Sequence, residues 1–383
     1  MMAKLMDITG KCFSGEWGLD DIDGTGIPVL RTTNFTNEGF VKFNNVVTRQ
    51  INKNNLDEKY LRNGDIIIEK SGGSDNQPVG RVIYFEGQEN KYLFNNFTGL
   101  LRVKDTTKWL PKYIFYSMFS NYQKGGTRPF ENKTTGLHNL KTDKYISSLE
   151  IKERPLSEQE KIADEIDSIC NLIYIRKQQL SKLDELVKSR FVEMFGDKFT
   201  NDKHWNTKLL GQCVSFHNGK AHEQVVDENG KYILVTSKAI ATDFKDIRRT
   251  NALLYPLKKN DIVMVMSDVP NGRALAKCQL IKEDNKFTLN QRICSFDNYK
   301  FNPLFLLHLL NRHNYFLDFN DGNGQTNLRK DDILDCVLIV PPIELQNKFA
   351  DFVEQIDKSK FEVQQGLKKL ETLKKSLMQQ YFG

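Results

Sequence analysis

The chain has 383 residues, long enough for two or three domains that each bury a core of their own. Its hydrophobic content of 39% and charged content of 27% are ordinary for soluble globular proteins. The formal net charge of +6, from 55 basic and 49 acidic side chains, suits a surface that meets phosphates but supports nucleic-acid binding only weakly by itself. The sequence contains no apolar signal core and no run of about 18 apolar residues, so we expect a cytoplasmic protein without a membrane segment.

The cysteine pattern argues against a metal site and against a disulfide framework. Six cysteines are scattered along the chain, and no two of them form a CxxC pair. We therefore predict free or buried thiols in a reducing compartment. They are Cys12, Cys170, Cys213, Cys278, Cys294 and Cys336.

Residues 1–154 combine short strands and turns with one or two helices. A helix led by Pro111 is expected over residues 113–119, because proline favours the first turn of a helix. The remaining apolar stretches are short and separated by turn residues, which is typical of a curved sheet in an α+β domain. The predicted strands lie at 65–68, 82–85, 100–103 and 146–151.

Residues 155–197 are predicted to form one long helix. Apolar side chains alternate at four and three residues along it, and eight of the ten positions in this stripe are apolar. Over five heptads such a stripe indicates coiled-coil packing, and about 40 residues give a rod of roughly 60 Å. The stripe consists of Ile162, Ile166, Ile169, Ile173, Arg176, Leu180, Leu183, Val187, Arg190 and Met194.

Residues 198–341 repeat the first region with loops of different length. The run Asp261 to Met264 resembles Asp65 to Ile68, and Gly272-Arg273 resembles Gly80-Arg81. A second proline-led helix is expected at 303–312. A constant framework with divergent loops is what a binding module with two specificities would show.

Residues 342–383 repeat the long helix. When the chain is shifted by 187 positions, 15 of the 42 residues in this segment are identical to those of 155–196 without a gap, whereas chance would give roughly two or three. The matching stripe consists of Phe349, Val353, Ile356, Lys360, Val363, Leu367, Leu370, Lys374, Leu377 and Tyr381. Two such stripes in one chain can pack on each other. The alternative is that each helix packs only on its own globular region, which the length of the rods disfavours.

The layout resembles the specificity subunit of type I restriction-modification systems over the whole chain. The most specific residues are the run 155–163, which opens the first long helix, and the run 188–197, which closes it. Pro341-Pro342 and the final Phe382-Gly383 match these landmarks in the second copy. The first domain lacks the tryptophan-led segment that begins at Trp205 in the second.

The resemblance implies an α+β fold with two homologous target recognition domains, at 1–154 and 198–341, joined by two antiparallel coiled-coil helices with pseudo-two-fold symmetry. Each domain would read one half of a split double-stranded DNA target, and the helix pair would set the gap between the halves. The helices would also dock two modification subunits, and through them the complex would include restriction or motor subunits. S-adenosylmethionine, ATP and Mg would belong to those partners, so the chain itself would carry no cofactor.

Loops at equivalent places in the two copies carry side chains suited to DNA. Asn and Gln can pair with adenine edges, Arg and Lys can meet guanine or phosphate, and glycines allow close approach of the backbone. Each residue taken singly also fits a solvated turn, so the prediction rests on the loops as sets. The predicted DNA-binding residues are Lys70, Ser71, Asn76, Gln77, Arg81, Lys124, Arg128, Lys133, Thr134, Thr135 and Asn139 in the first copy, and Ser267, Asn271, Arg273, Gln291, Arg292, Gln325, Thr326, Asn327 and Arg329 in the second.

Motifs for catalysis are missing from the sequence. No GxxxxGK[ST] phosphate loop and no glycine-rich methyl-donor fingerprint occurs. A nuclease-like set of Asp143, Glu150 and Lys152 has no counterpart in the second copy, and histidines five residues apart have poor metal geometry on a helix. We therefore expect a non-catalytic DNA-binding subunit. The alternatives are a self-contained DNA-modifying enzyme and a coiled-coil scaffold without a DNA role.

Overall fold

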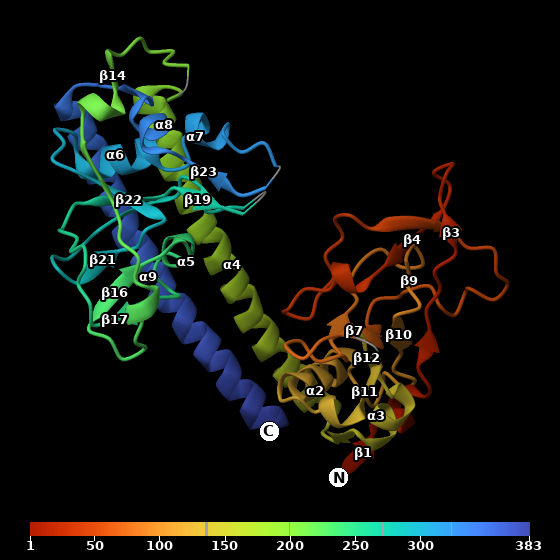
Figure 1. Cartoon of the computed structure of the whole chain (residues 1–383). Helices are drawn as coiled ribbons and strands as arrows, with labels where there is room; N and C mark the ends of the chain where they lie inside the picture. Colours follow the sequence, from red (N-terminus) through yellow and green to blue (C-terminus); the bar gives the residue numbers. More distant parts are fainter. Residues whose placement is uncertain (135–136, 199, 270–271, 323) are drawn as a thin grey trace. The chain divides into compact units, whose positions relative to one another are not determined.

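The computed structural model describes residues 1–134, 137–198, 200–269, 272–322 and 324–383 (Figure 1). The chain divides into two compact units, each of which is described by itself. Unit 1 comprises Met1–Arg176 together with Gly366–Gly383, and unit 2 comprises Lys177–Gln365. Both long helices therefore contribute to both units. No helix among the described residues combines the length and apolar character needed to cross a lipid bilayer.

Unit 1 is built on a four-stranded antiparallel sheet in the order β2-β10-β6-β8. Its central strand β6 (Ile66–Glu69) is buried along its whole length. Ile66 and Ile68 belong to the hydrophobic cluster that includes helix α2 (Pro111–Gln123), whereas Ile67 belongs to a separate cluster. This alternation is what the period of a β-strand requires when both faces of a sheet are covered. The other strands are β2 (Phe13–Ser14), β8 (Val82–Tyr84) and β10 (Thr98–Leu101).

A second four-stranded sheet, two smaller sheets and several short helices complete unit 1. One sheet has the order β3-β5-β4-β9, another pairs β1 with β13, and the third has the order β11-β12-β7. The strands are β1 (Met2–Lys4), β3 (Leu19–Asp20), β4 (Ile27–Leu30), β5 (Val47–Gln50), β7 (Ser71–Gly73), β9 (Leu93–Phe94), β11 (Glu131–Thr134), β12 (Leu137–Leu140) and β13 (Glu150–Lys152). The helical segments are α1 (Leu5–Thr9), η1 (Thr32–Asn34), η2 (Arg128–Phe130) and α3 (Thr142–Ser148).

One strand predicted from the sequence is partly wrong. The run 146–151 was expected to be extended, but α3 continues to Ser148 and only β13 is a strand. The adjacent side chains Tyr145 and Ile146 are both buried, because α3 lies between β1 and η2 and contacts α1. Asp143, Lys144, Ser147 and Ser148 are exposed, so α3 buries one face only. A helix of seven residues is too short for its period to stand out in the sequence, and the apolar residues at 149 and 151 alternate as in a strand.

Unit 2 repeats the topology of unit 1. Its main sheet has the order β15-β22-β18-β20, and its central strand β18 (Ile262–Val265) again alternates between two clusters. The remaining strands are β14 (Thr207–Leu209), β15 (Ser215–Asn218), β16 (Tyr232–Val235), β17 (Arg248–Thr250), β19 (Ser267–Asp268), β20 (Cys278–Leu280), β21 (Phe287–Leu289), β22 (Ile293–Asp297), β23 (Thr326–Asn327) and β24 (Val337–Ile339). The helical segments are η3 (Leu210–Gln212), η4 (Glu223–Val225), α5 (Ser237–Ala241), α6 (Pro303–Leu310), α7 (Asn314–Leu317) and α8 (Lys330–Leu334). The repeat in the sequence is therefore a repeat of structure.

The long helices α4 (Leu156–Phe195) and α9 (Ile343–Phe382) contain 40 residues each. Every position of the predicted apolar stripes except Arg176 is buried or partly buried. In unit 2, Asp184 of α4 bonds Lys360 of α9 at 2.6 Å, and the Phe195 ring lies 5.6 Å from that of Phe349. Residue numbers rise along one helix as they fall along the other, so the helices run antiparallel in this unit.

The corresponding contact in unit 1 joins the start of α4 to the end of α9. The Tyr381 hydroxyl donates to the Glu165 carboxylate at 2.5 Å, and the Phe382 ring lies 5.4 Å from Tyr113 of α2. The alternative in which each helix packs only on its own globular region is therefore wrong.

A buried glutamine locks the start of α4 to the segment that leads into α2. Gln159 is completely buried. Its amide oxygen accepts from the Leu110 backbone N–H at 2.9 Å, and its amide nitrogen donates to the carbonyls of Lys108 and Arg154, each at 2.9 Å. Buried polar groups need such partners, because an unsatisfied one costs about 1–3 kcal/mol.

The second copy has the same lock at Gln346. This side chain is 2% exposed, accepts from the Asn302 N–H at 2.9 Å and donates to the Pro341 carbonyl at 2.8 Å. Leu110 and Asn302 are the N-cap residues of α2 and α6. Each long helix is thus fixed to the proline-led helix of its own copy.

We expect Gln159→Leu and Gln346→Leu each to lower the free energy of unfolding by about 2–4 kcal/mol, because each leaves buried backbone groups without partners. Urea unfolding measures the loss. The control Gln355→Leu, on the exposed face of α9, should change stability by less than about 0.5 kcal/mol. A loss at Gln159 or Gln346 no larger than the control would contradict the assigned role.

His313 provides a pH-sensitive cap in unit 2. The buried imidazole precedes α7, and its Nδ1 accepts from the Tyr315 N–H at 3.3 Å. Burial, together with the neighbouring Lys198 ammonium, lowers the pKa of His313 from its ordinary 6.5 to about 4. Protonation would also remove the acceptor that caps the helix.

The stability of the folded chain should therefore fall as the pH drops from 6.5 towards 4. In this window the unfolded chain binds a proton at His313 that the folded chain resists, a difference worth up to about 3 kcal/mol. His313→Asn keeps a capping acceptor but does not titrate, so this variant should lose less stability than the wild type. Urea unfolding at pH 7, 6, 5 and 4 tests this, and identical slopes would rule out His313 as the source.

Candidate nucleic-acid interface

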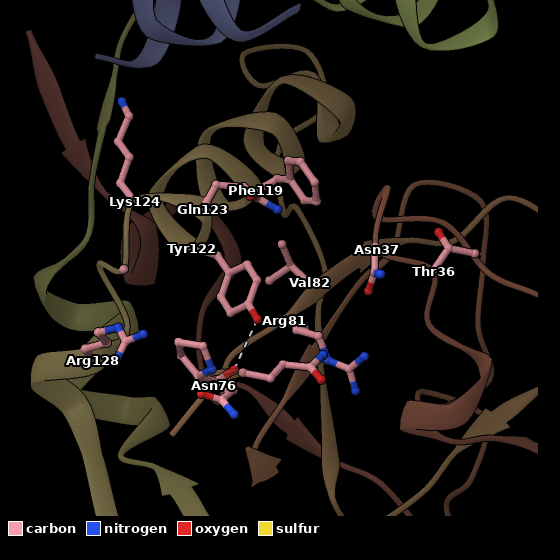
Figure 2. A pocket seen from close by; sticks show the side chains of 13 residues that line it. Thr36, Asn37, Asn76, Arg81, Val82, Phe119, Tyr122, Gln123, Lys124 and Arg128 are labelled. Atoms are coloured by element: carbon pink, nitrogen blue, oxygen red, sulfur yellow. Dashed lines mark hydrogen bonds between the residues drawn. The ribbon is translucent and has the colours of Figure 1, made fainter. Parts of the chain in front are cut away.

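A pocket of about 720 Å³ in unit 1 gathers residues from three separate segments (Figure 2). The segments are the turn after η1, the loop between β7 and β8, and the end of α2 with the turn that follows it. Five residues singled out from the sequence line this pocket: Asn76, Gln77, Arg81, Lys124 and Arg128. Two loops that are far apart in the sequence are therefore combined into one polar, basic surface.

Arg81 lies at the base of this pocket and is bound to a buried acid. Its Nε and Nη2 donate to the two carboxylate oxygens of Glu69 at 3.0 and 2.9 Å. Glu69 is 1% exposed, and the Arg81 guanidinium also lies 5.6 Å from the Phe35 ring. A bidentate ion pair of this kind fixes the orientation of the guanidinium plane as well as its position.

The loop between β7 and β8 is held at its base while its tip stays exposed. The Tyr122 hydroxyl donates to the Pro78 carbonyl at 3.1 Å, as the dashed line in Figure 2 shows, and the Val79 N–H donates to Glu131 at 3.0 Å. Burial raises the pKa of Tyr122 to about 12, so this hydroxyl keeps its proton. Asn76 and Gln77 are exposed at the tip. The anchored base therefore positions two exposed amides.

A glycine is required where this loop returns to the sheet. Gly80 has φ +102°, a region that favours glycine, and a Cβ there would lie 2.6 Å from Thr127. The loop can therefore pass close to the turn after α2. This approach brings the 76–81 and 124–128 segments together.

The lysines near the pocket are engaged within unit 1. Lys124 donates to the Phe382 carbonyl in the last turn of α9 at 2.7 Å, which is a favourable place for a cation. Lys70 donates to the Ser14 hydroxyl at 3.0 Å. Arg128, in contrast, is exposed at the pocket rim. Arg128 is thus better placed than either lysine to meet a phosphate.

A strand pair next to the pocket carries further predicted residues. Ser71 of β7 pairs with Asn139 of β12, and the Leu140 N–H donates to the Lys70 carbonyl at 2.8 Å. The backbone of Lys133 and Thr134 belongs to β11, which pairs with β12. The side chains of these two residues, and Thr135 as a whole, lie outside the described residues.

Unit 2 places its predicted residues on the equivalent strand pair. Ser267 of β19 pairs with Asn327 of β23, and the Leu328 N–H donates to the Met266 carbonyl at 2.8 Å. Gln325 donates to the Ser267 hydroxyl at 2.5 Å, and Thr326 is buried. The same Ser–Asn pairing and the same backbone bond therefore occur in both copies. Arg273, Gln291, Arg292 and Arg329 are exposed, and Asn271 lies outside the described residues.

Sequence analysis did not single out Glu69, Tyr122, Thr36 or Asn37 as parts of this surface. Glu69 ends an apolar strand and Tyr122 ends an aromatic-rich helix, so both resemble ordinary framework residues. Thr36 and Asn37 lie in a polar turn without a distinctive motif. Only the tertiary contacts join these residues to the loops that were recognised.

The acids and histidines considered for catalysis are dispersed. Asp143 lies on α3 and Glu150 on β13. His217 contacts Asp297 at 3.0 Å, and His222 is buried against Thr288. Within the described ranges, no group of three or more His, Cys, Asp or Glu side chains is arranged to hold a metal ion.

Comparison with known proteins agrees with this architecture. The S subunit of a type-I restriction-modification system from M. genitalium is 16% identical, with a TM-score of 0.56 over 100% of this chain and 96% of that chain. A chain from a structure described as showing complex assembly and conformational transition of the type I R-M system is 13% identical, with a TM-score of 0.58 over 100% and 97%. No curated protein matches the sequence.

At these levels of identity the two structures support the fold, whereas the family assignment comes from the sequence. The family model described as type I restriction modification DNA specificity domain matches residues 2–185 and again residues 202–374. The two matches cover most of the chain and correspond to the two copies described above. The chain therefore belongs to the family of type I restriction-modification specificity subunits.

Proposed function

We propose that the two domains each read one half of a split sequence in double-stranded DNA. The observation that carries this proposal is the shared strand pair, Ser71 with Asn139 and Ser267 with Asn327, flanked in each copy by loops of different sequence. A common framework supplies the same position for contact, and divergent loops supply different base preferences. The chain would bind DNA and leave the chemistry to its partners.

The pocket in unit 1 supports contact with a duplex. Exposed Asn76 and Gln77 offer groups that can reach base edges, and exposed Arg128 offers a cation for phosphate. Arg81 and Tyr122 are positioned by internal bonds, so little ordering of this part of the pocket is needed when DNA binds. The predicted residues of unit 2 would act in the same way on the other half of the target.

We further propose that the long helices dock two modification subunits and set the gap between the two half-sites. Tyr174 on α4 is 58% exposed. Leu172 and Ile175, which lie three residues apart on another side of the same helix, are 45% and 49% exposed and form an apolar patch. Such a patch suits a protein partner. Restriction or motor subunits would join through the modification subunits, in the cytoplasm. S-adenosylmethionine, ATP and Mg would be bound by those partners, and this chain would need no cofactor.

The two alternatives lack support. A scaffold without a DNA role does not account for membership of a DNA specificity family, and the family model that matches both copies describes a specificity domain rather than a catalytic one. The purified chain incubated with DNA and S-adenosylmethionine, or with DNA and Mg, should show no turnover. Methylation or cleavage by the chain alone would favour the enzyme alternative.

An exchange of domains tests the reading of half-sites. We expect that replacing residues 1–154 with the corresponding domain of a related subunit changes one half of the methylated sequence and leaves the other half unchanged. The measurement is methylome sequencing of cells that carry the chain with its modification subunit. Cells with the unmodified chain serve as the control, and they should contain one split methylated motif. A change in both halves after the exchange would contradict the proposal.

A further inference from the structure

The amide of Gln77 is oriented by Arg81. When the amide is oriented with its oxygen towards Arg81, that oxygen lies 3.1 Å from Nε and 3.0 Å from Nη1. A guanidinium has only donors, so the amide must turn its oxygen towards Arg81 and its NH₂ group away. Nη1 donates to that oxygen, and the single N–H of Nε is shared between it and the Glu69 carboxylate.

The orientation of the Arg81 guanidinium is itself fixed by hydrogen bonds. It donates to the two oxygens of the buried Glu69 carboxylate at 3.0 and 2.9 Å and to the Thr32 carbonyl at 3.4 Å. Rotating the guanidinium would break charge-assisted bonds and leave the Glu69 carboxylate buried without a partner. The orientation of the Gln77 amide is therefore imposed from the interior of the domain.

Gln77 is exposed and lines the pocket, so the face that it offers to a ligand consists of N–H donors only. In the major groove, guanine presents two acceptors, O6 and N7, and thymine presents the acceptor O4. Cytosine presents only an amino donor, and adenine places an amino donor beside its N7 acceptor, so that a face made of donors alone meets a second donor there. A free glutamine reads adenine with its oxygen and nitrogen together, but here the oxygen is already occupied.

We propose that Gln77 is a specificity-determining residue that selects a keto base, guanine or thymine, at one position of the half-site read by unit 1, with Arg81 as its positioning residue. This inference rests on the proposed function, because it assigns a base class within that DNA contact. It also changes the role expected from the sequence, which was pairing with adenine.

A glutamine in unit 2 shows why the partner matters. Gln325 donates to the Ser267 hydroxyl at 2.5 Å and to Asn327 at 3.3 Å. A hydroxyl can donate or accept, and an asparagine side chain offers both kinds of group, so these partners do not impose one orientation. Arg81 does impose one, because it offers nothing but donors.

The decisive variant is Gln77→Glu, which is nearly the same shape. One carboxylate oxygen keeps the contact with Arg81, and the other replaces the NH₂ group, so the outward face changes from donor to acceptor. We expect the preference at one base position to move from guanine or thymine to adenine or cytosine, by roughly tenfold in relative binding. The other positions of both half-sites should keep their preferences.

The experiment uses the complete complex with its modification subunits and a library of duplexes in which each position of the target is randomised in turn. Asn76→Asp adds the same charge to the same loop without facing Arg81, and it should weaken binding to all sequences alike. Gln77→Met removes the donors and should abolish the preference at the same position. Gln77 is exposed, and urea unfolding should confirm that all three variants are as stable as the wild type.

Three results would overturn the inference. They are an unchanged base preference in Gln77→Glu, a change that falls in the other half-site, and the same shift in preference in Asn76→Asp, which would reflect charge alone. In each case the wild-type complex would still recognise a split sequence, so the proposed function would stand. A wild-type complex without any sequence preference would instead remove the proposed function, and this inference with it.

Discussion

The framework of each unit depends on one hydrogen-bonded amide at the start of a long helix. Gln159 and Gln346 are buried, and each holds the N-terminal end of the proline-led helix of its own copy. The apolar stripes on the long helices can slide or rotate at small cost, since hydrophobic contact has no direction. A buried amide with fixed partners has one satisfied geometry, and so it sets the register between the long helix and the domain.

That register determines where the variable loops lie. The proline-led helix α2 covers the face of the main sheet, and its end forms one wall of the pocket in unit 1. A shift of α4 would therefore move Tyr122 and the turn after it relative to the loop that carries Gln77. In unit 2 the loops differ, but the equivalent hydrogen bond is present, because the Asn302 N–H at the start of α6 donates to Gln346. Because both copies share the same hydrogen-bonded framework beneath their loops, the loop sequences can differ between the copies without loss of the fold.

Much of this fold could be predicted from the sequence because its signals are periodic or repeated. The stripes of α4 and α9 recur every three or four residues, and the run Asp65 to Ile68 recurs as Asp261 to Met264. The strand pairings of Ser71 with Asn139 and of Ser267 with Asn327 could not be predicted, although all four residues are among the candidates. The organisation of the pocket could not be predicted in this way. Glu69 ends a run of isoleucines, and its partner Arg81 lies beyond a loop, so neither residue type nor spacing connects them. The sequence predicts a strand in place of α3 because a helix of seven residues is too short to show its period clearly.

The ion pair at the base of the pocket belongs to one copy only. The sequence position that matches Glu69 is Val265, which is buried in an apolar cluster, and the match of Arg81 is Arg273, which is exposed. The desolvation of a buried ion pair offsets most of its electrostatic attraction, so the pair adds little to stability. What it provides is a fixed orientation of the two side chains. The two copies thus share the strand pair that carries the candidate residues, but they differ in the side chains around it. Two domains with one framework can for this reason differ in the direction of their hydrogen bonds to DNA.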